Sequence, residues 1–252
     1  MITVAWGATE SAFLVGRFMP QHPAAKEGDF IKMSITLYDL CGADENHRFS
    51  PTCWRVKAAL AHKGLSYETI PTPFTKIKEI VEGDQKTVPY IVDGETKVVD
   101  SAKIAAYLEE TYPDAPSLFE GERGVAATVF MTQWAMTLVP QIAGLVVKDI
   151  CDSLAPVDQE YFRTSREAMF KRTLDDVQAG RDDRIEPFRA SLQPLRAMLA
   201  HQPYISGSTP LYPDYVVYGT IKWLVATAPF EVFAADDPVK TWFDAIDAIA
   251  TA

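Results

Sequence analysis

Between Ile35 and Thr111 the apolar positions alternate between runs typical of strands and spacings typical of helices. Runs rich in β-branched and aromatic residues predict strands, and apolar residues three and four positions apart predict helices. The predicted order is strand 35–40, helix 50–63, strand 65–71, a short helix 76–81, strands 88–92 and 97–100, and helix 101–111. The Asp93-Gly94 pair between the last two strands is a strong hairpin signal.

The order of these elements predicts the fold of the first part of the chain. A strand, a helix and a second strand form a βαβ unit, whose parallel strands need a right-handed crossover. The helix, hairpin and helix that follow complete the arrangement of a thioredoxin-like domain. In this domain a four-stranded mixed sheet carries helices on both faces, and we assign residues 33–113 to it.

Helical periodicity dominates the second part of the chain. After Tyr112, residues 113–121 form a proline-containing connector, and almost no strand-like run follows it. The predicted helices span residues 122–150, 158–178, 185–200, 213–226 and 238–249. The sequence therefore predicts an α/β plus all-α protein, with an all-helical domain at residues 122–252.

Residues 1–32 show no comparable pattern. This segment has an apolar patch but lacks the basic start and the small-residue cleavage site of a signal peptide. We expect a poorly structured extension. Because strong patterning begins only at Met33, we hypothesise that Met33 is the native start.

Composition narrows the classes of function. The chain is 48% hydrophobic and 23% charged, and no stretch approaches the roughly 18 consecutive apolar residues of a membrane helix. The formal net charge of -10 argues against nucleic-acid binding, because a phosphate backbone requires a basic surface. The four histidines and three cysteines show no metal-ligand spacing, so we predict no metal site. An odd number of widely spaced cysteines suits a reducing cytoplasm.

The pair Ser50-Pro51, followed by Cys53, opens the first predicted helix and has two interpretations. Serine is a favoured N-cap and proline a favoured first helical residue, so the pair needs no function. Cys53 shares a core-facing stripe with Val56 and Leu60, and alone these residues favour the structural interpretation. A helix N-terminus at this place nevertheless stabilises an anion. The serine could donate a hydrogen bond to a thiolate that another molecule supplies, and glutathione is the natural thiol.

Two further pairs mark element boundaries where a peptide-like thiol could bind. Val88-Pro89 begins a strand, where a cis peptide bond would present the Val88 backbone to a ligand, although proline also starts strands without any function. Asp100-Ser101 begins a helix, where it could hold a γ-glutamyl group or serve as an ordinary N-cap. The occurrence of all three pairs in this order favours a glutathione site.

With these motifs the chain resembles the glutathione transferase superfamily, from about Ile35 to the C-terminus. More narrowly, the segments FSPTCWRVKAALAHKG (49–64), EYFRTSREAMF (160–170) and LDDVQAGRDDR (174–184) resemble bacterial β-aryl etherases and fungal etherase-related transferases. The bacterial enzymes cleave lignin-derived ethers. The resemblance implies that the first domain binds glutathione and that an electrophile is held between the two domains.

The resemblance also implies roles for individual residues. Ser50 would donate a hydrogen bond to the glutathione thiolate. Val88 would pair with the cysteinyl unit through its backbone, and Pro89 would be the cis proline. Asp100 and Ser101 would bind the γ-glutamyl group.

Candidates for the electrophile pocket lie in the helical domain. Phe130, Trp134 and Leu138 fall at four-residue spacing on the first long helix, although such a stripe is more often ordinary core. Tyr218 and Trp223 carry the same ambiguity.

Charged residues of the motifs are harder to assign. Lys86 could meet the glycine carboxylate of glutathione, but a solvated surface lysine is the favoured interpretation. Arg163 and Arg166 could bind a substrate carboxylate or form ion pairs, and we favour a structural role for both. The chain departs from the family at Leu211, where many members have a Ser or Thr cap three residues before an aspartate.

The predicted function is that of a glutathione transferase whose thiolate attacks an electrophilic carbon. For an aryl ether, the resemblance implies displacement of a phenolate from the carbon next to a ketone. Glutathione is a co-substrate, and we expect a small aromatic electrophile, a cytoplasmic homodimer, and no nucleic-acid, membrane or metal partner. Three alternatives stay open: a general detoxifying transferase, a thiol-disulfide reductase that uses Cys53, and a non-catalytic ligand carrier.

Overall fold

The structure is a computed structural model that describes residues 34–80 and 87–252. The predicted N-terminal extension at residues 1–32 and the proposed start at Met33 lie outside the described residues. Lys86, the candidate for the glycine carboxylate, lies outside them as well.

Four strands form one mixed sheet in the order β2-β1-β3-β4. They are β1 (Ile35–Leu40), β2 (Tyr67–Thr72), β3 (Tyr90–Asp93) and β4 (Thr96–Val99). β1 pairs in parallel with β2, and β3 runs antiparallel to both β1 and β4. The hairpin turn between β3 and β4 begins one position later than the sequence signal suggests, at Gly94, whose φ of 59° suits a residue without a side chain.

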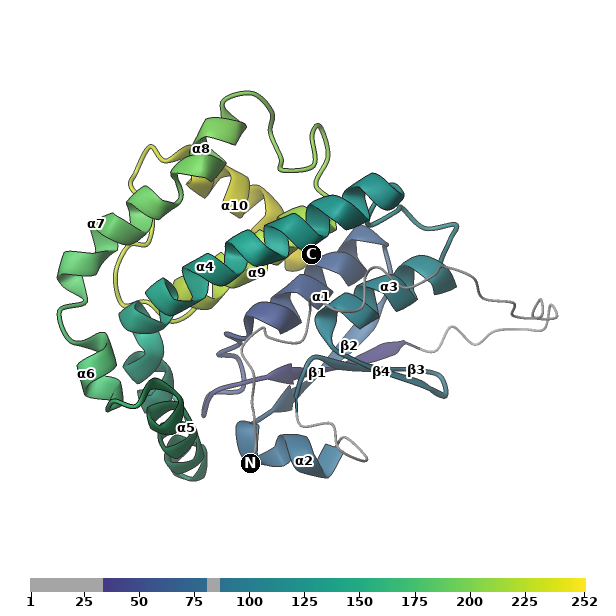
Figure 1. Ribbon diagram of the computed structural model, residues 1–252. Coiled ribbons are helices and arrows are strands. Elements are labelled where there is room, and N and C mark those ends of the chain that lie inside the picture. The colour runs from purple at the N-terminus through teal and green to yellow at the C-terminus, as the bar shows by residue number, and fades with distance from the viewer. Residues whose placement is uncertain (1–33, 81–86) are drawn as a thin grey trace.

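Helices cover both faces of this sheet (Figure 1). α1 (Pro51–His62) and α3 (Ser101–Thr111) lie on one face, and α2 (Ile77–Ile80), which follows a single 3-10 turn (Phe74–Lys76), lies on the other. The predicted thioredoxin-like fold is therefore confirmed.

The rest of the described chain is helical. Its helices are α4 (Glu122–Asp152), α5 (Pro156–Phe170), α6 (Leu174–Gln178), α7 (Asp182–Ser191), α8 (Gln193–Leu199), α9 (Tyr212–Val225) and α10 (Pro238–Ala250). α4 and α9 run side by side through the centre of this part (Figure 1). The predicted class of an α/β domain followed by an all-helical domain is confirmed.

Two of the predicted helices are each divided in two. The segment 158–178 breaks because Lys171 adopts a left-handed φ of 55°, and the Thr173 hydroxyl then caps α6 by accepting from the Asp176 N–H at 3.1 Å. The segment 185–200 breaks at Leu192, and Pro194 stands in the first turn of α8. Periodicity carries across both short breaks, which is why the sequence did not reveal them.

Among the described helices, α4 is long and apolar enough to cross a membrane by length and composition alone. Its most apolar 18-residue window has a mean hydropathy of 1.3, and 44% of that window is buried inside the protein. α4 packs against α9, α6 and α7. Since a central core helix has this same composition, we interpret α4 as the core of the helical domain.

At the N-terminus of α9, Asp214 makes up for the absence of a Ser or Thr at the cap position. Leu211 offers no side-chain acceptor, but the buried carboxylate of Asp214 accepts from the backbone N–H of Leu211 at 3.2 Å. The same carboxylate accepts from the N–H groups of Ile205 and Ser206 and from the Trp242 indole. The Asp214 side chain thus binds the backbone N–H of Leu211, the residue before α9, and ties the start of this helix to the preceding loop and to α10.

The two domains meet most closely where α9 crosses α1. At Gly219 the α9 backbone approaches so near to α1 that an added Cβ would lie 2.3 Å from the Pro51 carbonyl oxygen. Close by, the Arg55 guanidinium donates to the Thr220 hydroxyl at 3.2 Å. The position therefore excludes every side chain.

Replacement of Gly219 by alanine is expected to destabilise the protein by about 1–3 kcal/mol, because the rigid backbone of α1 must move. Chemical denaturation measures this loss. Gly144→Ala in α4 is the matched control, since its Cβ would come within 2.8 Å of a side-chain end, the Nη1 of Arg184, while the nearest backbone atom, the Val177 carbonyl oxygen, would lie at an ordinary 3.8 Å. The Arg184 guanidinium, which donates to the Val177 and Ala179 carbonyls, can shift at less cost than the backbone of α1, and a helical alanine is otherwise favoured. Equal stability of the two variants would contradict the tight-crossing interpretation.

A second link between the domains passes through the imidazole of His62 at the end of α1. Because a carbonyl oxygen can only accept, Nε2 donates to the Ser117 carbonyl at 3.0 Å, and Nδ1 accepts from the Tyr215 hydroxyl at 2.7 Å. Burial lowers the pKa of His62 below its ordinary value of 6.5. The neutral ring is therefore the form that holds the connector and α9 together.

A lowered pKa in the folded state means that the unfolded chain binds more protons below pH 6.5. Stability is expected to fall as pH decreases from 6.5, by at most about 1.4 kcal/mol per pH unit from this group. We expect His62→Gln to lose stability at pH 7.5 but to show a shallower decline between pH 6.5 and 5.5. Denaturant titrations across this range provide the measurement, and identical slopes for the two proteins would refute the assignment.

Candidate active site

Ser50 is the N-cap of α1. Its hydroxyl oxygen accepts from the Cys53 N–H at 3.3 Å and lies 3.2 Å from the Thr52 hydroxyl, and Pro51 follows in the first turn. Ser50 is 4% exposed. Either hydroxyl can donate in the contact with Thr52, and when Thr52 donates, the Ser50 hydrogen is available to a ligand at the positive end of the helix dipole.

Aromatic and charged groups fix the loop before Ser50. The Phe49 ring is buried and lies 6.3 Å from the Phe74 ring, measured between centroids. The Trp54 indole donates to the Arg48 carbonyl at 2.9 Å. The buried Asp39 at the end of β1 forms an ion pair with Arg48 at 3.2 Å. Ser50 is thus held by its neighbours on both sides in the sequence.

The other predicted glutathione residues lie at the same end of the sheet as the close of β1. In register, Tyr38 of β1 stands opposite Tyr90 of β3, which stands opposite Val99 of β4. The end of β1, the start of β3 and the end of β4 therefore lie at the same end of the sheet. The Val88–Pro89 peptide bond is cis, as predicted, and the Asp100 N–H donates to the Pro89 carbonyl at 3.3 Å.

Asp100 and Ser101 form the N-terminus of α3. The Asp100 carboxylate accepts from the N–H groups of Ala102 and Lys103 at 2.9 and 3.2 Å. Its φ of 83° is a conformation that favours glycine, and such outliers concentrate at functional sites. Ser101 is buried, and its carbonyl accepts from the Tyr212 hydroxyl of α9 at 2.8 Å.

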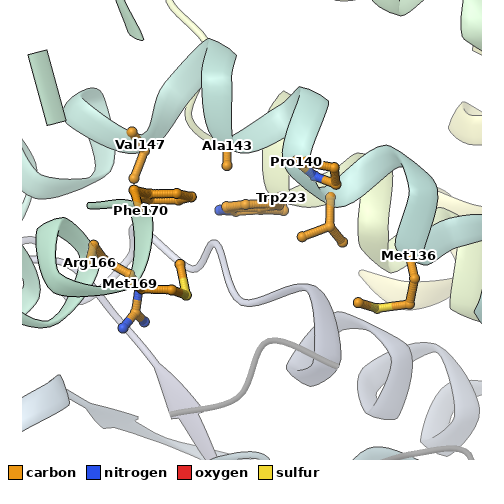
Figure 2. A pocket seen from close by; sticks show the side chains of 9 residues that line it. Met136, Pro140, Ala143, Val147, Arg166, Met169, Phe170 and Trp223 are labelled. Carbon is orange, nitrogen blue, oxygen red and sulfur yellow. The ribbon is translucent and has the colours of Figure 1, made fainter. Parts of the chain in front are cut away.

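An apolar cavity of about 210 Å³ lies between α4, α5 and α9. Figure 2 shows the Phe170 and Trp223 rings side by side below α4, with Met136 at one end of the cavity and Arg166 at the other. The full lining consists of Met136, Val139, Pro140, Ala143, Val147, Arg166, Met169, Phe170 and Trp223. Arg166 is the one charged side chain among them.

None of the predicted pocket residues of α4 lines this cavity. Phe130 is 67% exposed, Trp134 is half-buried, and Leu138 is buried in the core. The cavity uses the neighbouring stripe of the same helix, which includes Met136 and Pro140. That stripe also has helical spacing, so the sequence gives no reason to prefer it without the position of α9. Trp223, which the sequence left ambiguous, is a lining residue.

Two contacts connect the cavity with the Ser50 loop. Gly219 touches Pro51, and Trp223 follows it by four residues on the same face of α9. On the other side, the Arg166 guanidinium lies 5.8 Å from the ring of Phe74, which also contacts Phe49. The cavity is therefore linked to the Ser50 loop in two ways, by one turn of α9 and by the ring of Phe74.

Two protein-family models match the chain, one in each domain. The family "Glutathione S-transferase, N-terminal domain" matches residues 46–116, and the family "Glutathione S-transferase, C-terminal domain" matches residues 126–245. Within the described residues, no three His, Cys, Asp or Glu side chains could hold a metal ion together.

Among curated proteins, Glutathione S-transferase Z1 of Arabidopsis thaliana is 44% identical over 69 residues, which cover 25% of this chain and 31% of the relative. The match to Glutathione S-transferase Z2 of the same plant spans 40% of that protein's length.

Solved structures match over far more of the chain. Glutathione S-transferase CsGST63524 of Ceriporiopsis subvermispora, solved in complex with glutathione, has a TM-score of 0.74 and 24% identity, covering 86% of this chain and 97% of its own. Beta-etherase LigF of Sphingobium sp. strain SYK-6 has a TM-score of 0.58 and 18% identity, covering 86% and 96%. With both domain families matched and the same architecture throughout, the chain belongs to the glutathione transferase superfamily.

Proposed function

We propose that the protein is an enzyme that conjugates glutathione with an aromatic electrophile. The observation that carries this proposal is the Ser50 hydroxyl, which caps α1 by accepting from the Cys53 N–H and can give its own hydrogen to a ligand when Thr52 is the donor in the contact between the two hydroxyls. A thiolate at this place receives that hydrogen bond and the positive end of the α1 dipole. Both effects lower the thiol pKa, and so raise the fraction of reactive thiolate at neutral pH.

The rest of glutathione would bind at the end of the sheet where β1 and β4 end and β3 begins. The Val88 backbone, two residues before the start of β3, would pair with the cysteinyl unit as an added strand. The N-terminus of α3 offers the Asp100 carboxylate for the amino group of the γ-glutamyl unit. Ser101, the first residue of α3, would bind its carboxylate.

The electrophile would occupy the cavity between α4, α5 and α9. The catalytic contribution of the protein is then the positioning of the two reactants and stabilisation of the thiolate. The contact of Gly219 in α9 with Pro51 would keep the glutathione site and the cavity at a fixed distance from each other.

We further propose that aryl ethers are among the substrates. The thiolate would attack the carbon next to a ketone, a C–S bond would form, and the C–O bond would break with its electron pair leaving on a phenolate. The segment 160–170, which resembles the β-aryl etherases, supplies the cavity residues Arg166, Met169 and Phe170. The resemblance therefore concerns residues that would contact the substrate.

The first experiment measures glutathione-dependent release of a fluorescent phenol from a β-aryl-ether ketone. We expect Ser50→Ala to lower kcat/KM by roughly 10- to 100-fold, the loss of one hydrogen bond to a charged group. Ser50→Thr retains the hydroxyl and should recover much of the activity. The thiolate absorbance of bound glutathione, followed with pH, should show a raised thiol pKa in the alanine variant alone.

Four results would each oppose one of these proposals. Phenol release without glutathione, or unchanged activity and thiol pKa in Ser50→Ala, would contradict the role of the serine. Conjugation of simple chloronitrobenzenes without any ether cleavage would leave a general detoxifying transferase. Binding of glutathione and aromatic ligands with no turnover of either substrate would indicate a ligand carrier.

The structure disfavours a reductase that uses its own cysteines. Cys53 is completely buried in α1, and burial strongly raises the pKa of its thiol. Burial also raises the pKa of Cys41 to about 11 and raises that of Cys151. None of the three thiols therefore has the exposed, low-pKa character of a redox nucleophile.

We accordingly expect the native protein to react slowly with a thiol reagent such as Ellman's reagent at pH 7.5. After unfolding in guanidinium chloride, all three cysteines should react rapidly. Cys53→Ala should leave the glutathione-dependent activity within a few-fold of wild type. One fast-reacting thiol in the native protein, absent from Cys53→Ala, would revive the reductase hypothesis.

A further inference from the structure

Three charged side chains form a cluster next to the first turn of α1. Asp39, at the end of β1, is completely buried, and its carboxylate pairs with the Lys57 amino group at 2.5 Å and with the Arg48 guanidinium at 3.2 Å. The side chains of Lys57 and Arg48 are only 9% and 13% exposed. We call these three residues the charge cluster. It combines two cations with one carboxylate, so its net charge is positive.

The contacts of the charge cluster place it at the Ser50 end of α1. Arg48 precedes Ser50 by two residues, and its carbonyl accepts from the Trp54 indole at 2.9 Å. Lys57 belongs to the second turn of α1, but its amino group lies 4.1 Å from the ring centroid of Trp54, in the first turn. This is the direction in which helical side chains lean. The positive charge therefore lies at the same end of the helix as the Ser50 hydroxyl.

Stability alone gives little reason for a buried cluster of this kind. Removing charges from water is costly, and apolar residues of similar volume often stabilise a core equally well or better. The sign of the cluster is also opposite to that of the chain, whose formal net charge is -10. An excess of buried positive charge at a helix N-terminus favours an anion there, and the proposed function supplies one in the glutathione thiolate.

Other charged residues lie around this end of α1. Lys222 of α9 lies 4.5 Å from the Trp54 ring centroid, but it pairs with Asp247 of α10 at 2.5 Å, so this pair is neutral as a whole. Arg55 turns towards α9. Asp158, the buried carboxylate of α5, accepts from a backbone N–H of the 3-10 turn at 2.7 Å. The variants described below leave these residues unchanged, so a comparison among the variants reports on the charge cluster.

We propose that the charge cluster stabilises the glutathione thiolate at Ser50, with Lys57 supplying the excess positive charge and Asp39 holding both cations in place. This inference rests on the proposed function, because it concerns the thiolate of the same site. It requires no contact between the cluster and glutathione, since buried charges act over several ångströms with little screening. The three residues are therefore positioning residues for the thiolate and not catalytic residues.

The test depends on the sign of the change in the thiol pKa. Lys57→Met removes one positive charge and keeps a long side chain, so the thiol pKa should rise by about 0.5–1 pH unit. Asp39→Asn removes the negative charge and keeps the shape, so the thiol pKa should fall by a similar amount. A purely structural role predicts a rise in both variants, because looser packing around Ser50 would weaken its hydrogen bond to the thiolate.

Two thiols report this pKa. The first belongs to bound glutathione and is followed through its thiolate absorbance. The second is introduced by Ser50→Cys and is followed through the pH dependence of its alkylation by iodoacetamide, in protein without glutathione. The three native thiols are buried, so the introduced thiol reacts first. We expect Lys57→Met and Asp39→Asn to shift both thiols in the stated directions.

Two further variants serve as controls. Lys57→Arg keeps the charge and should retain the wild-type thiol pKa. Lys63→Met removes another buried lysine of α1 from an ion pair, formed with Glu109 at 2.9 Å, but this lysine lies at the opposite end of the helix, about 20 Å from Ser50. It should leave both thiol pKa values unchanged. Circular dichroism confirms that each variant is folded.

The outcomes separate this inference from the proposed function. Thiol pKa values that do not move in opposite directions in Lys57→Met and Asp39→Asn would overturn the role of the charge cluster and leave the transferase intact. Failure to bind glutathione would contradict the proposed function, while opposite shifts of the introduced thiol would still support the charge cluster. If Asp39→Asn does not fold, Lys57→Met decides, since a thiol pKa equal to that of Lys57→Arg and Lys63→Met refutes the proposal.

Discussion

The close packing of α9 on α1 is the contact on which the rest of the structure depends. α1 lies between the sheet and α9, so every residue from Cys53 to Leu60 is buried and neither side of the helix faces solvent. Its first turn is the candidate thiolate site, and its backbone at Pro51 touches Gly219. A change in the α1–α9 distance would therefore alter the sheet packing, the domain junction and the reactive centre together.

Burying α1 on all sides requires partners for its charged residues. Lys57 pairs with the buried Asp39 at 2.5 Å and also lies over the Trp54 ring, while Arg55 reaches Thr220 across the domain junction. Each of these charges would cost several kcal/mol if it were left buried and unpaired. The resulting network specifies one orientation of α1, and with it the direction of the Ser50 hydroxyl.

Features fixed by local chemistry could be predicted from the sequence. Ser50 caps α1 and Asp100 caps α3, because caps depend on a few adjacent residues. The cis Val88–Pro89 bond was expected from the family resemblance instead, since only about 5–6% of X-Pro bonds in folded proteins are cis. The cavity stripe of α4 could not be predicted, since Met136 and Leu138 are equally apolar and only the positions of α5 and α9 decide which lines the space. The left-handed residue that ends α5 likewise left no periodic signal.

The contrast between locally fixed and packing-dependent features explains why the sequence indicates the site of the nucleophile but not the substrate. A thiolate site needs a donor, a dipole and a backbone edge, and each of these has a short motif. An aromatic pocket needs shape, and core and pocket share one composition.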